Sequence, residues 1–278
     1  MSYLVIGDSC TDLTKEQKAA GEIRLVPLTL DVNDEVFIDD ETFSQEKFLA
    51  AMKESPVCPK SACPSPGAYM KHFDESDEIY VITLSARLSG SYNSAELAKE
   101  MYVEEHGEKD IFVIDSRSAS VGQTLIAMKI QELKEAGKSF DEVCNEVLQY
   151  RNDLQTKFVL ESLDNLRKNG RLTNLQAILA NALNIKPVMK GTYEGEIDKV
   201  DQARGIKKAL LRMVDLIVQD AEHPEDRILG ISHCNNLERA HFVKEELAKR
   251  IQFKDTIIVD TAGVSSLYAN DGGIIVCY

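Results

Sequence analysis

Three short apolar runs, each followed by a turn of small hydroxyl-bearing residues, constrain the fold of this 278-residue chain most strongly. They are Tyr3–Gly7 ahead of Ser9, Ile79–Leu84 ahead of Ser89, and Ile111–Ile114 ahead of Ser116. Each run is typical of a buried strand, and a helical pattern follows each turn. In an open parallel sheet, the loops at the carboxyl ends of the strands meet at one edge, where ligands bind. The three turns are therefore expected to lie together.

The middle turn has the composition of an anion site. Ser89, Gly90 and Ser91 precede a helical pattern, so free backbone amides and the positive end of a helix dipole would favour a carboxylate or phosphate there. Serine is also an ordinary N-cap residue, so a simple helix cap explains the same composition. Both interpretations remain open at this point.

The pattern changes near residue 154, which predicts two domains. Residues 1–153 are expected to form an α/β domain with a parallel sheet, without the Gly-x-Gly-x-x-Gly of a dinucleotide fold. Residues 154–278 hold short strands, a hairpin signature at Gly191–Gly195 and separate helices. This is typical of an α+β domain with a mixed or antiparallel sheet.

Two stretches of the first domain are expected to lack regular structure. The acidic segment Asp31–Asp40 is interpreted as a turn-rich connection. Segment 57–67 carries three prolines and is interpreted as a rigid loop that presents Ser61 and Ser65. The region near 61–70 is expected to pack on the second domain.

Composition excludes several classes of protein. A net charge of −14 argues against nucleic-acid binding, and the absence of an 18-residue apolar run argues against insertion into a membrane. The six cysteines are scattered, without metal-ligand spacing, and no signal peptide precedes the first strand. We therefore expect a cytoplasmic protein with free thiols, no metal and no cofactor.

Charge is spread unevenly along the chain. Between Arg167 and Arg212, ten Lys or Arg residues oppose four Asp or Glu, a net of +6. A local docking surface for an anionic partner is one interpretation, and an ordinary solvated face is the other. The candidate docking residues are Arg171, Arg204, Lys207 and Lys208.

No hydrolase or nucleotide-binding motif is present. His233 and Cys234 are adjacent on a predicted strand, so their side chains point to opposite faces and make a poor catalytic pair. Hydroxyls and amides without an evident base fit binding better than catalysis. The alternative is an enzyme that acts on a small carboxylated or phosphorylated metabolite, with His233 as the acid or base.

An apolar helical face follows Arg171. Leu175, Ile178 and Leu179 belong to a stripe with helical spacing. Such a stripe usually packs in a core, and lining a site for an apolar ligand is the less common alternative.

Taken in order, the motifs resemble those of the DegV family of bacterial fatty-acid-binding proteins. They are Asp8-Ser-x-Thr-Asp-Leu13, Ser61-Ala-Cys-Pro-Ser-Pro66, Leu84-Ser-x-x-Leu-Ser-Gly-Ser-Tyr-x-Ser-Ala95, Asp115-Ser116 with Gly122, Leu166-Arg-Lys-Asn-Gly-Arg171, Asn184-Ile-Lys-Pro187 and Arg204. The resemblance covers residues 3 to about 240.

The resemblance implies a function. It implies a two-domain fold that buries a long-chain fatty acid in an apolar tunnel, with the carboxylate at the domain interface. Similar family members present that carboxylate to a fatty acid kinase, which makes an acyl phosphate for phospholipid synthesis. By position, Ser61 is implied to be one carboxylate contact, and Ser89 with Gly90 the second. The full candidate ligand set is Ser61, Ser89, Gly90, Ser91 and Ser120 for the head group, with Leu175, Ile178 and Leu179 near the tail.

The chain departs from the family pattern at two places. Ala62 and Cys63 replace the usual Ser and Gln. The family also has a C-terminal histidine before Gly-Pro-Gly, and no histidine lies within Ser265–Gly273, where Leu267 falls at roughly the expected position. That histidine helps hold the head group and faces the kinase, so kinase coupling is the property on which this departure bears most.

Overall fold

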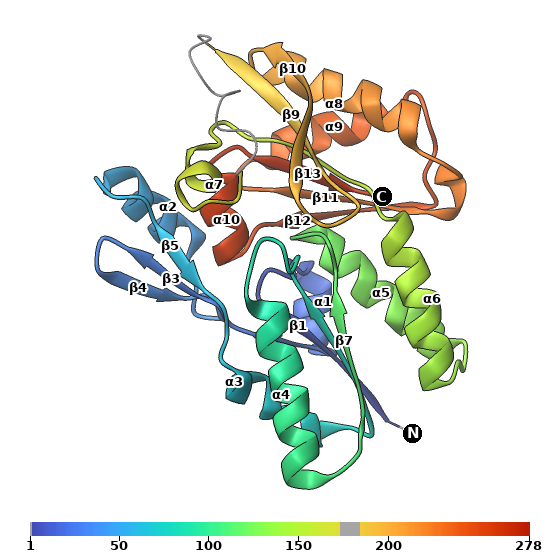
Figure 1. Ribbon diagram of the computed structural model, residues 1–278. Helices are drawn as coiled ribbons and strands as arrows, with labels where there is room; N and C mark the ends of the chain where they lie inside the picture. Colours follow the sequence, from blue (N-terminus) through green and yellow to red (C-terminus); the bar gives the residue numbers. More distant parts are fainter. Residues whose placement is uncertain (1, 173–183) are drawn as a thin grey trace.

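Three β-sheets organise the protein in a computed structural model that describes residues 2–172 and 184–278. Figure 1 shows the first sheet in the lower half of the molecule and the largest sheet in the upper half. The first sheet uses strands before residue 116, and the largest sheet uses strands after residue 155. The domain boundary at 153/154 stays a prediction.

The first sheet is parallel throughout, as the repeated strand-and-turn units predict. Its order is β2-β1-β6-β7, with bounds Ile23–Val26, Tyr3–Asp8, Glu78–Thr83 and Asp110–Asp115. Pro27 follows β2, the edge strand, where a missing amide donor costs no hydrogen bond within the sheet. The turns after β1, β6 and β7 therefore leave the same edge of one sheet.

Helices cover both faces of the first sheet. On one face lie α3 (Pro66–Met70) and α4 (Ser91–His106), and on the other α5 (Val121–Glu135) and α6 (Phe140–Asp153). Successive side chains along a strand point to opposite faces of the sheet, so each strand contributes to both helix contacts. Leu4 and Ile6 contact the first pair of helices, and Val5 contacts the second.

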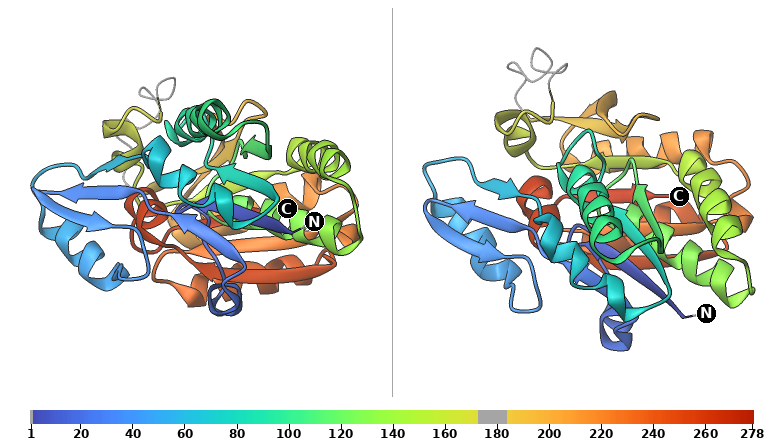
Figure 2. Two further views of the ribbon diagram at one scale, coloured as in Figure 1. Left: turned by 90° about the horizontal axis from the view of Figure 1, so that it is seen from below. Right: turned by 60° about the horizontal axis from the view of Figure 1, so that its bottom comes forward.

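A small antiparallel sheet corrects the prediction of irregular structure in two segments. Its order is β4-β3-β5, with bounds Glu35–Ile38, Thr29–Val32 and Lys60–Ala62. Asn33 and Asp34 both adopt positive φ, the geometry of a tight hairpin turn. The segment Asp31–Asp40 therefore contains the end of β3, this turn and all of β4. Within segment 57–67, three residues between Pro59 and Pro64 pair with β3 as an edge strand. Figure 2 shows this sheet, with α2 (Gln45–Glu54), at one side of the molecule.

The largest sheet is mixed, as predicted for the second domain. Its order is β10-β9-β8-β13-β11-β12, with bounds Ile197–Arg204, Ile185–Gly191, Thr156–Val159, Ile274–Cys277, Ile228–His233 and Asp255–Asp260. Only β11 and β12 run parallel to each other. The predicted hairpin around Gly191–Gly195 is present as β9 and β10. The remaining helices are α1 (Lys15–Ala20), α7 (Asp164–Lys168), α8 (Ile206–Asp220), α9 (Leu237–Ala248) and α10 (Gly263–Ala269), with short 3₁₀ turns at Phe73–Glu75 and Pro224–Asp226.

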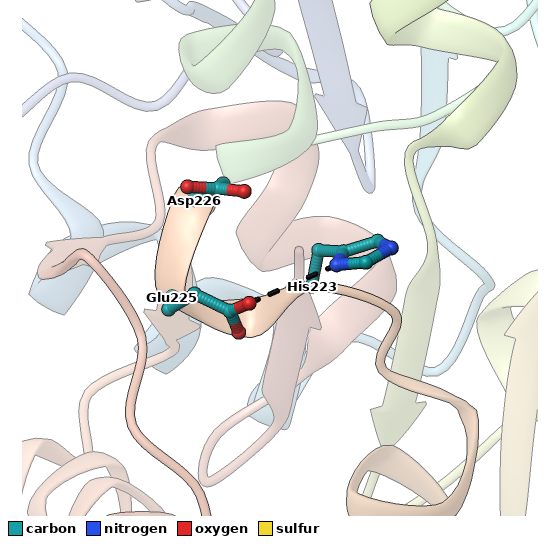
Figure 3. A group of neighbouring side chains, drawn as sticks. All are labelled: His223, Glu225 and Asp226. Carbon is teal, nitrogen blue, oxygen red and sulfur yellow. Dashed lines mark ion pairs between the residues drawn. The ribbon is translucent and has the colours of Figure 1, made fainter.

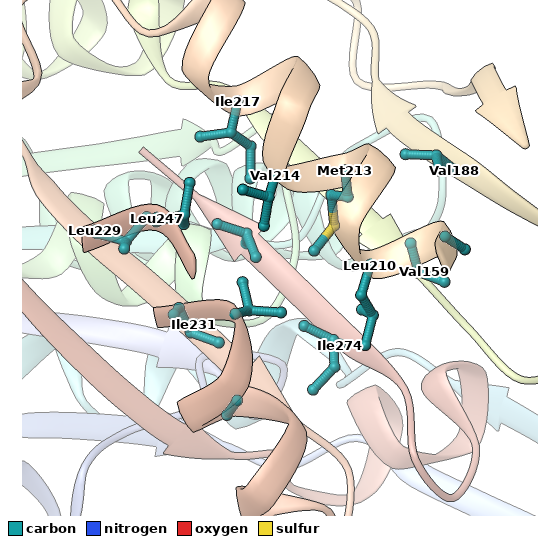
Figure 4. Close-up of a cluster of buried hydrophobic side chains, with 14 of the residues drawn as sticks. Val159, Val188, Leu210, Met213, Val214, Ile217, Leu229, Ile231, Leu247 and Ile274 are labelled. Carbon is teal, nitrogen blue, oxygen red and sulfur yellow. The ribbon is translucent and has the colours of Figure 1, made fainter. Parts of the chain in front are cut away.

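One face of the largest sheet packs against α8 and α9. Figure 4 shows Leu210, Met213 and Ile217 of α8 reaching toward strand residues such as Ile231 and Ile274. These five side chains are at most 2% exposed. Burying a side chain of this size stabilises the fold by roughly 1.5–3 kcal/mol. No helix in the described ranges has the length and apolarity needed to cross a membrane.

Helix α5 lies between the two large sheets. Ile126 and Ile130 pack on the first sheet, whereas Val121 and Leu125 pack with Val259 and Cys277 of the largest sheet. A helix that is apolar on several faces is typical of a buried position. The two sheets therefore share one central helix.

Buried carboxylates from the first domain hold the start of α10. Asp39 accepts the amides of Gly263 and Val264, at 2.6 and 2.9 Å, and Asp12 accepts the Ala262 amide at 2.6 Å. Burial raises the pKa of Asp12 to about 7, an effect that hydrogen bonds to its side chain only partly offset. Burial likewise raises the pKa of Asp39. The position of α10 therefore depends on carboxyl groups far away in the sequence.

We predict that Asp12 makes stability depend on pH. Because its pKa is about 7 in the folded protein and near 3.8 when unfolded, the folded state holds the proton more tightly. The free energy of unfolding should therefore fall as pH rises from about 4 to 7, relative to Asp12→Asn, by about 1.4 kcal/mol per pKa unit. Urea unfolding of both proteins between pH 4.5 and 8 measures this difference. A difference that stays constant over this range would contradict the prediction.

Candidate functional site

An apolar cavity lies on the face of the largest sheet opposite α8. The space between its walls, part of it open to solvent, is about 760 Å³. Most of its wall is aliphatic or aromatic, including Leu84, Phe158, Leu160, Leu166 and Ile275. Phe158 and Leu160 line the cavity, while Val159 between them packs in the α8 core, as the alternation of a strand requires.

The cavity runs along β8. Thr156 lines it at the start of the strand and Leu160 lines it just past the end, which spans roughly 13 Å at about 3.3 Å per residue. Beyond Leu160 the lining continues through Leu166 to Arg171. The cavity is thus elongated, with different residues at its two ends.

Arg171 and Tyr268 mark one end, which we call the polar end together with Ser61. The guanidinium of Arg171 lies 5.7 Å from the centre of the Tyr268 ring. The hydroxyls of Tyr268 and Ser61 are 3.0 Å apart, and Arg171 Nε donates to the Leu88 carbonyl at 3.0 Å. Ser61 comes from β5 and Tyr268 from α10, so this end is built by both domains.

The predicted Ser89–Ser91 turn lies beside the polar end. Ser89 follows Leu88, which lines the cavity, and a Cβ added at Gly90 would come within 3.1 Å of Cys63 Sγ. Gly90 is the N-cap residue of α4 and offers no capping side chain, while Ser89 Oγ accepts the Ser91 amide at 3.2 Å. The turn therefore begins the helix and also adjoins the strand that carries Ser61.

Ser120 lies elsewhere on the cavity wall. Its hydroxyl donates to Asp12 at 2.5 Å and lies 2.6 Å from the Ser232 hydroxyl. The structure thus connects Ser120 to the carboxylate that holds α10, and not to Ser61 or Ser89.

The tip of the β9–β10 hairpin closes the other end of the cavity. Gly191 and Gly195 line it, and Ser85 Oγ donates to the Gly195 carbonyl at 2.6 Å. Gly195 has a φ of +85°, and a Cβ there would lie 2.4 Å from Ser85 Oγ. The Arg117 guanidinium stacks on the Tyr193 ring of the hairpin at 4.7 Å. The close docking of this tip requires glycine at 195.

Tyr268 is a site residue that the sequence did not identify. Leu267, at the position where the family resemblance suggested a histidine, is fully buried in a core with Leu30 and Phe48. The next residue, Tyr268, is the one that lines the cavity and reaches Ser61. Neighbouring side chains on a helix point about a third of a circle apart, so Leu267 and Tyr268 face different surroundings. In the sequence, the aromatic ring of Tyr268 was the one sign that this position differs from its neighbours.

The predicted docking residues do not form one group. Arg171 lines the apolar cavity, while Arg204, Lys207 and Lys208 are exposed around a concave surface at the start of α8. None of these three has an ion-pair partner within the parts of the chain that the structure describes. The predicted tail residues Leu175, Ile178 and Leu179 lie outside the described residues.

His233 is not among the residues that line the cavity. Its Nδ1 lies 3.4 Å from Asp260 Oδ1 and accepts the Asn236 amide at 3.3 Å, and burial lowers its pKa. Burial raises the pKa of Cys234 to about 11, which keeps its thiol protonated and unreactive. His233 therefore lies apart from the residues that line the cavity.

One surface group combines residue types that can bind metals. His223, Glu225 and Asp226 lie together on the turn before β11, as Figure 3 shows. His223 Nδ1 and Glu225 Oε1 are 3.7 Å apart, and their side chains are 80% and 65% exposed. An exposed group of this kind is common without a metal, and it is separate from the cavity.

Comparison with known proteins gives matches over the whole chain. The family model described as "Uncharacterised protein, DegV family" matches residues 2–278. A DegV domain-containing protein of Streptococcus pneumoniae is 35% identical over 280 residues, which cover 100% of this chain and 99% of that protein.

Solved structures give matches of the same extent. A DegV family protein from Ruminococcus gnavus, solved with vaccenic acid, is 50% identical with a TM-score of 0.97, and 100% of both chains is covered. The Streptococcus pneumoniae Fatty Acid Kinase (Fak) B3 protein, loaded with linoleic acid, is 33% identical with a TM-score of 0.90, over 100% of this chain and 99% of that one.

Filling the cavity should block it. Ile197 lines the cavity from β10, so Ile197→Trp places an indole in its space. We expect the affinity for the apolar anionic dye 1-anilinonaphthalene-8-sulfonate to fall at least tenfold, measured by fluorescence titration. The control is Tyr193→Trp, since Tyr193 is 63% exposed on the same hairpin and outside the lining. Equal dye affinity in the two variants, with native circular dichroism spectra, would show that the cavity is not a binding site.

Proposed function

The chain belongs to the DegV family, and on that premise we propose that it binds a long-chain fatty acid and presents it to a fatty acid kinase. The observation that carries this proposal is an elongated apolar cavity with a guanidinium and two hydroxyls gathered at one end. A fatty acid has the matching chemistry, with a long apolar chain and one terminal anion.

The apolar wall supplies the driving force for binding. Each buried CH₂ group contributes about 0.8 kcal/mol, so a C16 chain gains on the order of 10 kcal/mol before the cost of immobilisation is subtracted. Phe158, Leu160 and Leu166 present apolar side chains to the cavity in turn, which suits an unbranched chain.

The head group needs compensation for burial. A carboxylate that leaves water without hydrogen bonds is costly, whereas each charge-assisted hydrogen bond contributes roughly 1.5–3 kcal/mol. We assign the carboxylate to the polar end, with Ser61 as one donor and the Ser89–Gly90–Ser91 turn as the second contact. Ser120 has a different role in this assignment, because its hydroxyl is bonded to Asp12.

The kinase is the proposed partner, docked on the basic surface. The basic side chains assigned to docking are Arg204, at the end of β10, and Lys207 and Lys208, at the start of α8. Glu161, which lies in the same concave surface, follows directly after Leu160 of the cavity wall. The chain therefore passes directly from the cavity wall to the surface where the partner is proposed to bind.

The chain itself acts as a carrier in this proposal. Phosphoryl transfer is the work of the kinase, and no residue of this chain is assigned a catalytic role. We place the exchange in the cytoplasm, in keeping with the six free thiols.

The protein purified from a bacterial host should carry a C14–C18 fatty acid at close to one per chain. Denaturing extraction followed by mass spectrometry measures this content. Removing two charge-assisted donors in Ser61→Ala/Ser89→Ala should weaken binding by at least a hundredfold. The control is Ser55→Ala, whose hydroxyl lies in an exposed loop and bonds to the Val57 carbonyl. A wild-type protein that carries no lipid and takes none up on incubation would refute the proposed function.

Charge reversal should separate carrying from docking. In Lys207→Glu/Lys208→Glu, the fatty acid content should stay unchanged, while the affinity for the cognate kinase falls at least tenfold in low salt because complementary charges are lost. Surface plasmon resonance with the fatty-acid-loaded carrier measures the affinity for the kinase. Lys15→Glu/Lys18→Glu on α1 makes the same change of charge at another exposed helix. If both double variants bind the kinase like the wild type, the partner docks elsewhere.

A further inference from the structure

Two arginines meet beside the tip of the β9–β10 hairpin, away from the polar end of the cavity. Arg117 lies in the turn after β7, and Arg151 lies in the last turn of α6. The side chain of Asn152 joins them, because its Oδ1 accepts from Arg151 Nη2 at 2.9 Å and from Arg117 Nη1 at 3.4 Å. The two guanidinium groups therefore lie within reach of one acceptor.

The acceptors around this pair are neutral oxygens. Besides Asn152 Oδ1, they include the main-chain carbonyl of Asp115, which lies 3.1 Å from Arg151 Nη1. Arg151 Nε is buried and has no hydrogen-bond partner among residues 2–172 and 184–278. A buried donor without a partner is costly, so the protein alone leaves this guanidinium incompletely satisfied.

Carboxylates do not neutralise the pair. Of the ion pairs in the two described ranges, none includes Arg117 or Arg151, although Glu194 and Glu196 lie on the same hairpin. Burial lowers the pKa of Arg151, and the charge of Arg117 lowers that pKa further, while Asp115 offsets part of the effect. Two like charges are therefore held close together without a salt bridge to either.

The position and geometry of the pair suit a small anion. Both arginines are partly exposed, and the Arg117 guanidinium stacks 4.7 Å from the centre of the Tyr193 ring on the hairpin. Each guanidinium offers a planar fork of donors that matches the oxygens of a phosphate or a carboxylate. A phosphate monoester carries a charge of about −1.5 to −2 at pH 7, so it balances two arginines better than one carboxylate does.

We propose that Arg117 and Arg151 bind a phosphate group, either inorganic or on a small metabolite, beside the hairpin tip. The phosphate oxygens replace Asn152 Oδ1 as the acceptor that both guanidinium groups share. Because Arg117 also stacks on Tyr193, the bound phosphate ties α6 and the turn after β7 to the hairpin. This site and the proposed function can fail separately, since neither arginine belongs to the polar end.

The test is a titration of the isotope-labelled protein with inorganic phosphate, with sodium chloride used to keep the ionic strength constant. The Nε–H signals of Arg117 and Arg151 in nuclear magnetic resonance spectra should shift along a saturable curve, with a dissociation constant in the millimolar range or below. A second titration with glycerol phosphate distinguishes the two sources. Tighter binding of glycerol phosphate identifies a phosphorylated metabolite as the ligand, and tighter binding of inorganic phosphate identifies the ion itself.

Arg117→Gln/Arg151→Gln should lower the affinity for phosphate at least tenfold, measured by isothermal titration, because both charged forks are lost. The matched control is Arg24→Gln/Arg250→Gln, which removes the same charge from two arginines that already form ion pairs. It should bind phosphate like the wild type, and thermal unfolding checks that all proteins are folded. Arginine signals that do not shift in the wild type, or equal affinities of the two double variants, would overturn the inference.

Discussion

The capture of α10 by buried carboxylates is the interaction on which the site depends. Asp39 and Asp12 lie 224 to 250 positions before the amides that they accept. A buried carboxylate bonded to amides at a helix start satisfies donors that have no partner inside the helix. Together with the packing of Leu267 against Leu30 and Phe48, this contact fixes the position of Tyr268 relative to Ser61.

The two domains divide the work at the site. The largest sheet supplies a strand, β8, whose alternate residues line the cavity on one face and fill a helix-packed core on the other. The first domain supplies the turns and the edge strand that bring hydroxyls to the polar end. Central helix α5 packs on both large sheets and so holds the two parts of the site together.

Much of this arrangement follows from local sequence patterns. Other parts could not be predicted from the sequence, and each of these has a physical reason. The parallel sheet and the β9–β10 hairpin are set by apolar runs and turn residues, which act over a few positions. The strand at Lys60–Ala62 is held by pairing with β3, which is distant in the sequence. The prolines on either side predict a loop, so this pairing cannot be predicted from the local sequence. The role of Tyr268 depends on the rotation of a seven-residue helix, which is set by contacts with residues distant in the sequence, such as Asp39 and Leu30.

A crystal structure of the protein with bound oleic acid tests the central claim most directly. The account predicts electron density for the acyl chain along β8 between Phe158 and Ile275, with the carboxylate within hydrogen-bond distance of the Ser61 and Tyr268 hydroxyls. A carboxylate at the hairpin end of the cavity, or an acyl chain outside it, would contradict the account.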